Sequence, residues 1–319
     1  MAKIDILMAT YNGSEYLHEQ IDSIFHQTEK DWHLIIRDDG SNDDTPSLLV
    51  ELAKQHPNKI TVVQDSKGNL GPLSNFNELC QYSTAPYCSF SDQDDIWLPD
   101  KLSRAFEEMQ ILENNSSPNA PLMVYADRSI IDSKGKAVVD SYYKHQNIDA
   151  DSYSRLANNL GFCVAAGSTM LVNRILLEKS HPIPKQARMH DTWIELIATG
   201  LGNKTYFDEV ALSYRRHDNN VSGGSQDFKA SRKIISRALS LTKKIHYQKC
   251  GYITNYEQAK EFHKQFSTDL SKENLNNLES FISLEKANIV KRLFLIITKN
   301  LGPLSWERKL TFIIFGKTT

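Results

Sequence analysis

Three carboxylates lie close together in the segment from Ser89 to Trp97. Asp92, Asp94 and Asp95 follow directly on an apolar run that ends at Phe90. Carboxylates this close repel one another, and a divalent cation removes the conflict. Hard oxygen ligands suit Mg²⁺ or Mn²⁺, and Mg²⁺ is usually held by one or two carboxylates together with substrate phosphates. The segment therefore predicts a metal site that receives a diphosphate. The alternative is a polar loop that only caps the helix expected after Asp100.

Four apolar strand patterns alternate with amphipathic helical patterns in the first part of the chain. The strands are expected at Ile4–Ala9, Trp32–Ile36, Ile60–Val63 and Tyr87–Phe90. This alternation predicts a parallel sheet with right-handed crossovers, in which ligands bind outside the carboxyl ends of the strands. Polar residues follow three of these strand ends, at 10–12, 38–39 and 92–95. We therefore expect them to converge on one edge of the sheet.

The rest of the chain has a mixed middle and a helical end. Strands are expected at Leu122–Ala126 and Ala211–Arg215, and a helix is expected at Thr192–Ala198. From about residue 226 the pattern is helical, including Leu275–Leu284 and Glu285–Lys299. The periodicity predicts an α/β domain over residues 1–225 and a mostly helical region over residues 226–319.

The net charge of −2 conceals an asymmetry between these two parts. Residues 1–225 carry 20 Lys and Arg against 31 Asp and Glu, a balance of −11, and residues 226–319 carry 17 against 8, a balance of +9. In the basic part, cations alternate with apolar runs at Lys291–Lys299 and Trp306–Phe315. These runs are shorter than the roughly 20 residues that span a bilayer. They predict helices that lie in an anionic membrane interface, with packing on the rest of the chain or a homodimer contact as the alternatives.

The sequence also indicates a compartment. The chain enters a strand pattern almost at once, so no signal peptide is visible, and its 4 cysteines show no C-x-x-C spacing. These features favour a reducing compartment over a disulfide framework or a zinc site. We expect a cytoplasmic protein, peripheral on the inner face of the plasma membrane, with no nucleic-acid partner.

Three motifs together resemble a known family. Ile6–Gly13, Arg37–Thr45 and Asp92–Asp94 look like the corresponding motifs of family 2 glycosyltransferases in order, spacing and strand-end context, over roughly residues 3–220. The version Phe90–Trp97 resembles most the bacterial rhamnosyltransferases that build cell-surface polysaccharide. The resemblance implies a GT-A fold, a Rossmann-like mixed sheet that binds a nucleotide sugar and is flanked by helices, here with a C-terminal helical extension.

The resemblance also implies roles for individual residues. Asp191, in Met189–Trp193, occupies the position of the catalytic base of inverting members, although a helix N-cap is the structural alternative. Metal ligands are expected at Asp94, Asp92 and His217. The residues expected to contact the nucleotide sugar are Thr10, Tyr11, Asn12, Asp38, Asp39, Asn69, Asn75, Asp92, Arg215 and Arg216. Those expected to face an acceptor are Asp127, His190 and Trp193.

These expectations describe an inverting glycosyltransferase that depends on Mn²⁺ or Mg²⁺. Its expected donor is a nucleoside-diphosphate sugar, with dTDP-rhamnose as the expected example, and its expected acceptor is a saccharide or a lipid-linked saccharide. One alternative is a nucleotidyltransferase of related fold, which we would expect to carry a basic residue after the first strand, where Thr10–Ser14 has none. The other is a non-catalytic sugar- or lipid-binding scaffold, against which the retained carboxylates argue.

Overall fold

The computed structural model describes residues 2–218, 220, 253–302, 309–310 and 313–314. The predicted boundary between residues 225 and 226 lies outside the described residues, as does most of the basic run at 306–315.

The first part of the chain forms four parallel strands joined by helices. The elements are β1 (Ile4–Thr10), α1 (Leu17–Phe25), β2 (Trp32–Asp38), α2 (Thr45–Gln55), β3 (Ile60–Val62), α3 (Pro72–Cys80) and β4 (Tyr87–Ser91). β1 pairs in parallel with both β2 and β4, and β2 pairs in parallel with β3. The alternating strands and helices predicted from the sequence are confirmed.

The second part extends this sheet with strands of both directions. Its elements are β5 (Ile96–Trp97), α4 (Lys101–Asn114), β6 (Leu122–Asp132), β7 (Ala137–Val139), α5 (Tyr142–Gln146), α6 (Leu156–Asn159), β8 (Leu171–Asn173), α7 (Arg174–Ser180), α8 (His190–Leu201) and β9 (Asn203–Arg216). The strand order is β3-β2-β1-β4-β8-β6-β9-β5, with β7 beside β6. β8 is antiparallel to both of its neighbours, so the sheet is mixed, as expected.

Alternate residues of each strand supply two separate cores. Ile6 and Met8 of β1 point to the face covered by α1, α2 and α4, whereas Leu7 points to the face covered by α3, α7 and α8. This alternation follows from the period-2 geometry of a strand, and burial on both sides is typical of a parallel sheet.

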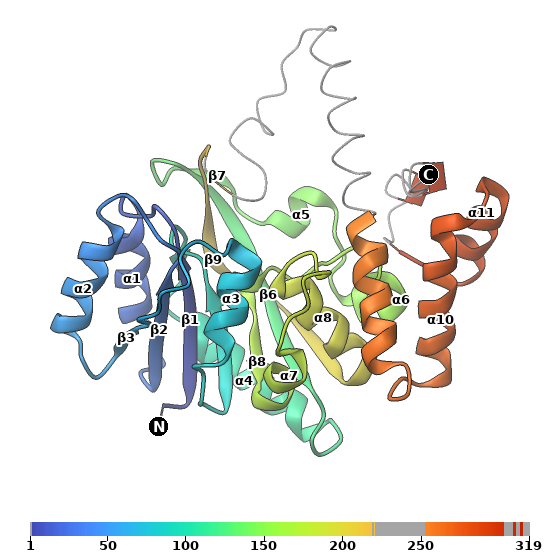
Figure 1. Ribbon diagram of the computed structural model, residues 1–319, viewed down its shortest axis with the longest axis horizontal. Coiled ribbons are helices and arrows are strands. Elements are labelled where there is room, and N and C mark those ends of the chain that lie inside the picture. Colours follow the sequence, from blue (N-terminus) through green and yellow to red (C-terminus); the bar gives the residue numbers. More distant parts are fainter. Residues whose placement is uncertain (1, 219, 221–252, 303–308, 311–312, 315–319) are drawn as a thin grey trace, which may run out of the picture.

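The C-terminal helices share the second of these cores. They comprise residues 253–266, α10 (Lys272–Ser283) and α11 (Ile289–Thr298), and they lie at the end of the molecule opposite β3 (Figure 1). Phe262 packs edge-on against Trp193 of α8, with ring centroids 5.9 Å apart. Gly302 N–H donates a hydrogen bond to the Ala157 carbonyl at 2.8 Å. The helical extension is therefore fastened to the sheet domain through a continuous hydrophobic core.

No helix in the described part of the chain is both long enough and apolar enough to cross a bilayer.

Candidate active site

The carboxyl ends of β1, β2 and β4 meet at one edge of the sheet, as predicted. Thr10, the last residue of β1, lies in register with Asp38 of β2, and its hydroxyl donates to Asp38 Oδ1 at 3.0 Å. The Tyr11 amide donates to Gln93 Oε1 at 2.8 Å, which connects the loop after β1 to the loop after β4. The three predicted polar clusters therefore form one connected surface.

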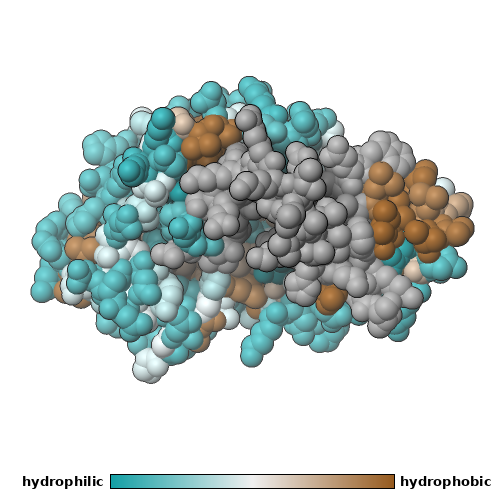
Figure 2. Space-filling model, turned by 90° about the horizontal axis from the view of Figure 1, so that it is seen from above, coloured by the Kyte–Doolittle hydropathy of each residue, from teal (hydrophilic) through white to brown (hydrophobic). Residues whose placement is uncertain are grey.

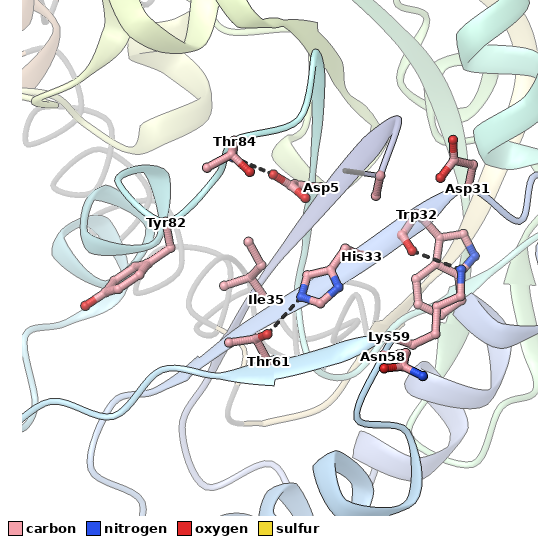
Figure 3. A pocket seen from close by; sticks show the side chains of 11 residues that line it. Asp5, Asp31, Trp32, His33, Ile35, Asn58, Lys59, Thr61, Tyr82 and Thr84 are labelled. Carbon is pink, nitrogen blue, oxygen red and sulfur yellow. Dashed lines mark hydrogen bonds between the residues drawn. The ribbon is translucent and has the colours of Figure 1, made fainter.

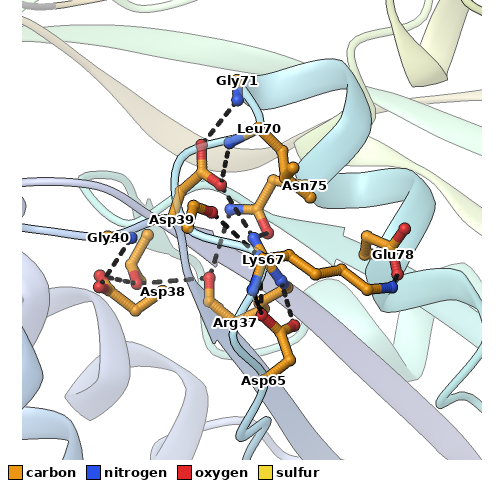
Figure 4. Close-up of polar contacts among 12 residues, drawn as sticks. Arg37, Asp38, Asp39, Gly40, Asp65, Lys67, Leu70, Gly71, Asn75 and Glu78 are labelled. Atoms are coloured by element: carbon orange, nitrogen blue, oxygen red, sulfur yellow. Dashed lines mark hydrogen bonds and ion pairs between the residues drawn. The ribbon is translucent and has the colours of Figure 1, made fainter.

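Asp38 and Asp39 are both held by groups within the protein. Asp38 Oδ2 accepts hydrogen bonds from the amides of Gly40 and Ser41. Asp39 is buried, and its carboxylate accepts from the Arg37 guanidinium and from the amides of Leu70 and Gly71, each at 2.8 Å (Figure 4). Asp39 therefore anchors the loop that precedes α3.

Arg37 is the centre of this network. Its buried guanidinium also bonds to Asp65 at 2.8 Å and to Asn75 Oδ1 at 3.0 Å (Figure 4). Asn75, expected to touch the nucleotide sugar, is buried beneath the loop, whereas Asn69 lies exposed on it. The geometry thus makes Asn75 a support for the loop and leaves Asn69 open to a ligand.

The Asp92–Asp95 cluster is crowded and poorly solvated. Burial, together with the nearby carboxylates of Asp94 and Asp191, raises the pKa of Asp92 to about 7. Burial, together with the carboxylates of Asp94 and Asp92, raises the pKa of Asp95 well above its ordinary value. Asp95 Oδ1 accepts from the Arg215 amide at 3.2 Å, and its buried Oδ2 has no hydrogen-bond partner among the described residues. The cluster therefore holds more negative charge than its own surroundings neutralise.

The donor set at this cluster suits a divalent cation. His217 Nε2 lies 2.7 Å from Asp94 Oδ2, so these two predicted ligands are in contact. The Asp94 charge also raises the pKa of Asp92, the third predicted ligand. No group of three or more His, Cys, Asp or Glu side chains is arranged to hold a metal ion within the described ranges. Two protein ligands suffice when substrate phosphates complete the shell of Mg²⁺ or Mn²⁺. The residues present thus fit a metal that is held jointly with a diphosphate.

Asp191 stands at the start of α8 and faces the same cluster. Its Oδ2 accepts from the Gly167 amide at 3.2 Å and its Oδ1 from the Thr192 amide at 2.7 Å. Its negative charge contributes to the raised pKa of Asp92. The N-terminal end of a helix stabilises a carboxylate. Asp191 is therefore an ionisable group fixed beside the cluster of Asp92 and Asp94.

His190 is enclosed beside Asp191. Its ring centroid lies 3.8 Å from that of Phe76 and 5.0 Å from that of Phe90. Burial lowers the pKa of His190 to about 4, so the ring is neutral near pH 7. Both ring nitrogens are buried without a hydrogen-bond partner in the described part of the chain. This enclosed ring does not have the open geometry that our prediction of an acceptor contact requires.

Comparison with known proteins identifies the class of enzyme. Residues 5–120 match the profile of "Glycosyl transferase family 2". An uncharacterised glycosyltransferase of Nostoc sp., alr2836, is 30% identical over 228 residues, which cover 70% of this chain and 68% of that protein. The chain belongs to glycosyl transferase family 2.

Two further similarities concern a named relative and the fold. The dTDP-rhamnosyl transferase RfbG of Shigella flexneri is 27% identical over 232 residues, covering 72% of this transferase and 78% of RfbG. The mannosyltransferase PcManGT of Pyrobaculum calidifontis, solved with GDP-Man and Mn²⁺, superposes with a TM-score of 0.53 at 14% identity, covering 99% of this chain and 84% of that one. These comparisons confirm the family and the GT-A fold, and they favour a transferase over both alternative classes of protein.

Three predicted contacts of the transferase need correction. Trp193 is fully buried, with its indole N–H bonded to the Ser180 carbonyl, so it is not available to an acceptor. Asp127 is buried as well, and it accepts from the Ser141 hydroxyl at 2.5 Å and from the Tyr143 amide at 3.2 Å, which places it at the N-terminal end of α5. It fixes that helix and does not face outward.

Arg215 is the third. Its side chain is buried, pairs with Glu19, and bonds through Nε to the Asp94 carbonyl at 3.0 Å. Its guanidinium also lies over the Tyr16 ring, 4.8 Å from the centroid. The fork expected to hold a diphosphate is thus already used to brace the loop of Asp94. Its neighbour Arg216 is half-buried at the end of β9.

A cavity of the transferase lies away from these residues. It measures about 530 Å³ and is lined by residues near the amino ends of β1, β2 and β3, including Asp5, His33 and Thr61 (Figure 3). Those polar groups have partners: His33 bonds to Thr61 at 2.8 Å, and Asp5 accepts from the Thr84 amide at 2.7 Å. Ligands of parallel sheets bind at the opposite ends of the strands, so this cavity is not the candidate site.

Two residues near the site were missed by sequence reasoning. The Gly167 amide donates a hydrogen bond to Asp191, whereas the sequence indicated only that the run of small residues from Gly161 to Ser168 could approach a sugar closely. Arg128 is the one cation of β6 and lies in its polar second half, between Asp127 and Ser129, and its environment depends on tertiary contacts.

Proposed function

We propose that this transferase moves a sugar from a nucleoside-diphosphate donor onto a saccharide with inversion at the anomeric carbon. The single observation that best supports the proposal is that two amides hold the Asp191 carboxylate at the start of α8, where its charge acts on Asp92 of the acidic cluster. One carboxylate at a helix start and a separate acidic pair with His217 give the two halves that such a reaction needs.

The reaction is a direct displacement in which Asp191 acts as the base. An acceptor hydroxyl attacks the anomeric carbon, the new C–O bond forms as the bond to the diphosphate breaks, and the hydroxyl proton passes to Asp191. The diphosphate leaves with the electron pair. The Gly167 and Thr192 amides hold both oxygens of Asp191, so its orientation is set before the acceptor arrives.

A divalent cation completes the diphosphate half of the site in this proposal. Asp94 and His217 are the ligands supported best by their mutual contact, with Asp92 as a third. When bound, Mg²⁺ or Mn²⁺ would neutralise the negative charge that develops on the leaving group. The mannosyltransferase PcManGT has the same fold and was solved with Mn²⁺, which supports a divalent cation in this proposal.

The proposed donor is dTDP-rhamnose and the proposed product part of a cell-surface polysaccharide. The support is the similarity to RfbG and the segment Phe90–Trp97. Exposed Tyr11 and Asn12, together with Asn69, are the residues best placed to contact the base and ribose, since Asp38 and Asp39 are held internally. A panel of nucleotide sugars, scored by hydrolysis and by thermal stabilisation, tests the donor.

The test of the mechanism is Asp191→Asn. The amide keeps the shape but is not a base, so we expect turnover to fall by about a thousandfold or more, with nucleoside-diphosphate affinity retained. Asp22→Asn, on the exposed side of α1, is the matched control and should behave as the wild type. Unchanged turnover in Asp191→Asn would show that Asp191 is not the catalytic base. Equal donor affinity with and without added Mg²⁺ or Mn²⁺ in the wild type would contradict the proposal that a metal ion helps to bind the donor.

We also propose that residues 226–319 attach the catalytic region to an anionic membrane, where a lipid-linked acceptor would lie. The apolar side chains Ile289, Val290, Leu293, Phe294 and Ile297 form one exposed face of α11; Val290 is 72% and Phe294 63% exposed. Figure 2 shows hydrophobic residues gathered at one end of the upper face of the molecule, where α11 lies in Figure 1. The carboxyl ends of the parallel strands point toward this same upper face in Figure 1. Exposed Lys291 adds positive charge beside them. An apolar stripe with flanking cations is typical of an interfacial helix.

Vesicle binding tests this attachment. The double variant Val290→Asp, Phe294→Asp should lose binding to vesicles that contain phosphatidylglycerol, because both charges would enter the apolar layer. Ile111→Asp, at a similarly exposed apolar position on α4, should bind as the wild type. If the double variant instead converts a dimer to a monomer and leaves vesicle binding unchanged, the face is a homodimer contact and the membrane proposal is wrong.

A further inference from the structure

Arg128 of β6 is held in an unusual environment. Its guanidinium carbon lies 4.5 Å from the centroid of the Tyr142 ring and 5.2 Å from that of the Tyr214 ring. Aromatic faces attract a guanidinium but leave its N–H groups without acceptors. Its Nε is buried and has no hydrogen-bond partner among the residues that the structure describes. A buried donor without an acceptor is costly, so this arrangement indicates a ligand.

The two aromatic walls are fixed independently of Arg128. Tyr142 begins α5, and that helix is held by the Asp127 carboxylate through the Tyr143 amide and the Ser141 hydroxyl. Tyr214 lies on β9, where the neighbouring Arg215 amide bonds to Asp95. The Arg128 slot is therefore built by buried contacts on both sides.

The slot lies near the acidic cluster of the active site, because Arg128 is in register with Leu212 of β9, which in turn pairs with Trp97 of β5, the strand that follows the cluster. The positive charge of Arg128 acts against burial and the neighbouring carboxylates, which raise the pKa values of Asp92 and Asp95. Arg128 nevertheless makes no ion pair with either carboxylate within the described ranges, whereas Arg215 is committed to Glu19. Arg128 is thus a cation near the cluster whose Nε–H has no acceptor among the described residues.

A diphosphate that enters this site meets several carboxylates and needs a compensating donor. Arginine is suited to that task because its planar fork matches two phosphate oxygens at once. We propose that Arg128, and not Arg215, is the arginine that binds the diphosphate of the nucleotide-sugar donor, which it does from the slot between Tyr142 and Tyr214. This assignment rests on the proposed function, since it takes the donor to be a nucleoside-diphosphate sugar.

The experiment compares ligands that differ only in their phosphates. Affinities for dTDP, UDP and GDP, and for the matching nucleosides, are measured by calorimetry in the full chain for the wild type, Arg128→Gln and Arg128→Lys. We expect Arg128→Gln to lower nucleoside-diphosphate affinity by about tenfold to a hundredfold without changing nucleoside affinity, because charged hydrogen bonds to phosphate are lost. Arg128→Lys should lose less, since it keeps the charge but not the fork.

Arg155→Gln is the matched control. It removes the same charge from an exposed pair with Glu273 and should bind every ligand as the wild type does. A thermal melt of each variant separates a structural role: lower stability with an unchanged ratio of nucleoside-diphosphate to nucleoside affinity would overturn the assignment.

The same measurements distinguish failure of the proposed function. If the wild type binds none of the three nucleoside diphosphates, with or without Mg²⁺ or Mn²⁺, the donor class itself is wrong and the Arg128 assignment falls with it. If the wild type binds one of them and Arg128→Gln binds it equally well, only the assignment of Arg128 is wrong.

Discussion

Gly167→Ala is the substitution whose effect on Asp191 the structure predicts most directly. A Cβ added at Gly167 would lie 2.5 Å from His190 Nε2 and 3.1 Å from its Cε1. Ordinary contacts begin at 3.4 Å, so one side must retreat by about 0.9 Å from the nearer atom. The ring of His190 has little freedom to move because it lies against Phe76 and Phe90. The main chain at Gly167 must therefore shift.

That shift would break the hydrogen bond that orients Asp191. The Gly167 amide already lies 3.2 Å from Asp191 Oδ2, and a further 0.9 Å of separation would exceed hydrogen-bonding distance. We expect the overpacked variant to lose about 1–3 kcal/mol of stability. We expect kcat to fall by about a hundredfold, the typical result of misplacing a catalytic group by about 1 Å. The affinity for the nucleoside diphosphate should be unchanged.

The assay combines thermal denaturation with turnover of a nucleotide sugar that the wild type uses. Gly200→Ala is the control: its Cβ would lie 2.8 Å from the Phe262 ring, far along α8 from Asp191, so it should lose stability and keep its kcat. Replacing His190 by Ala in the Gly167→Ala background removes the clash and should recover part of the lost turnover. Gly167→Ala with a kcat within twofold of the wild type, or no recovery in the double variant, would refute the reasoning.

Three further predictions concern stability. Burial lowers the pKa of His190 to about 4, below the roughly 6.5 of the unfolded chain, so the unfolded state binds more protons between these values and stability should fall as the pH drops from about 6.5 to 4. In urea titrations across this window, His190→Asn should remove roughly 3 kcal/mol of that loss. The same pH dependence in the variant and the wild type would contradict this prediction. Arg37→Met leaves Asp39 and Asp65 without their buried partner, so it should lower the free energy of unfolding by about 3–5 kcal/mol in urea denaturation. The variant should also bind nucleotide more weakly. A variant as stable as the wild type would show that the network is not needed. Asp127→Ala removes the acceptor at the start of α5 and should cost about 2 kcal/mol in the same assay, while Asp132→Ala at the half-buried end of β6 should cost less. Equal losses would argue against the helix-fixing role.

Much of the fold and the outline of the site followed from local patterns. Apolar runs of strand length alternating with helical stripes predicted β1 to β4 and their shared carboxyl edge, because the direction of parallel strands places their ends together. Asp92 and Asp94 could be named for the same reason, since both follow a strand, whereas Asp191 was named through the family resemblance. The direction of β8 and the full length of β9 were beyond such patterns, since strand pairing depends on segments far apart in the chain.

The sequence by itself determined the elements, the acidic edge and the family resemblance, because these depend on residue types and near-neighbour spacing. Only the tertiary structure decided which side chains are free to act. Glu19 lies 196 residues from Arg215 and pairs with its guanidinium, whereas Arg128 Nε has no acceptor in the part of the chain that the structure describes. Trp193 lies in the core because the C-terminal helices cover it. α11 buries only its side with Arg292 and Ile296, so its other, apolar side stays exposed. Partners of this kind are chosen by packing between distant segments, and no local pattern records that choice.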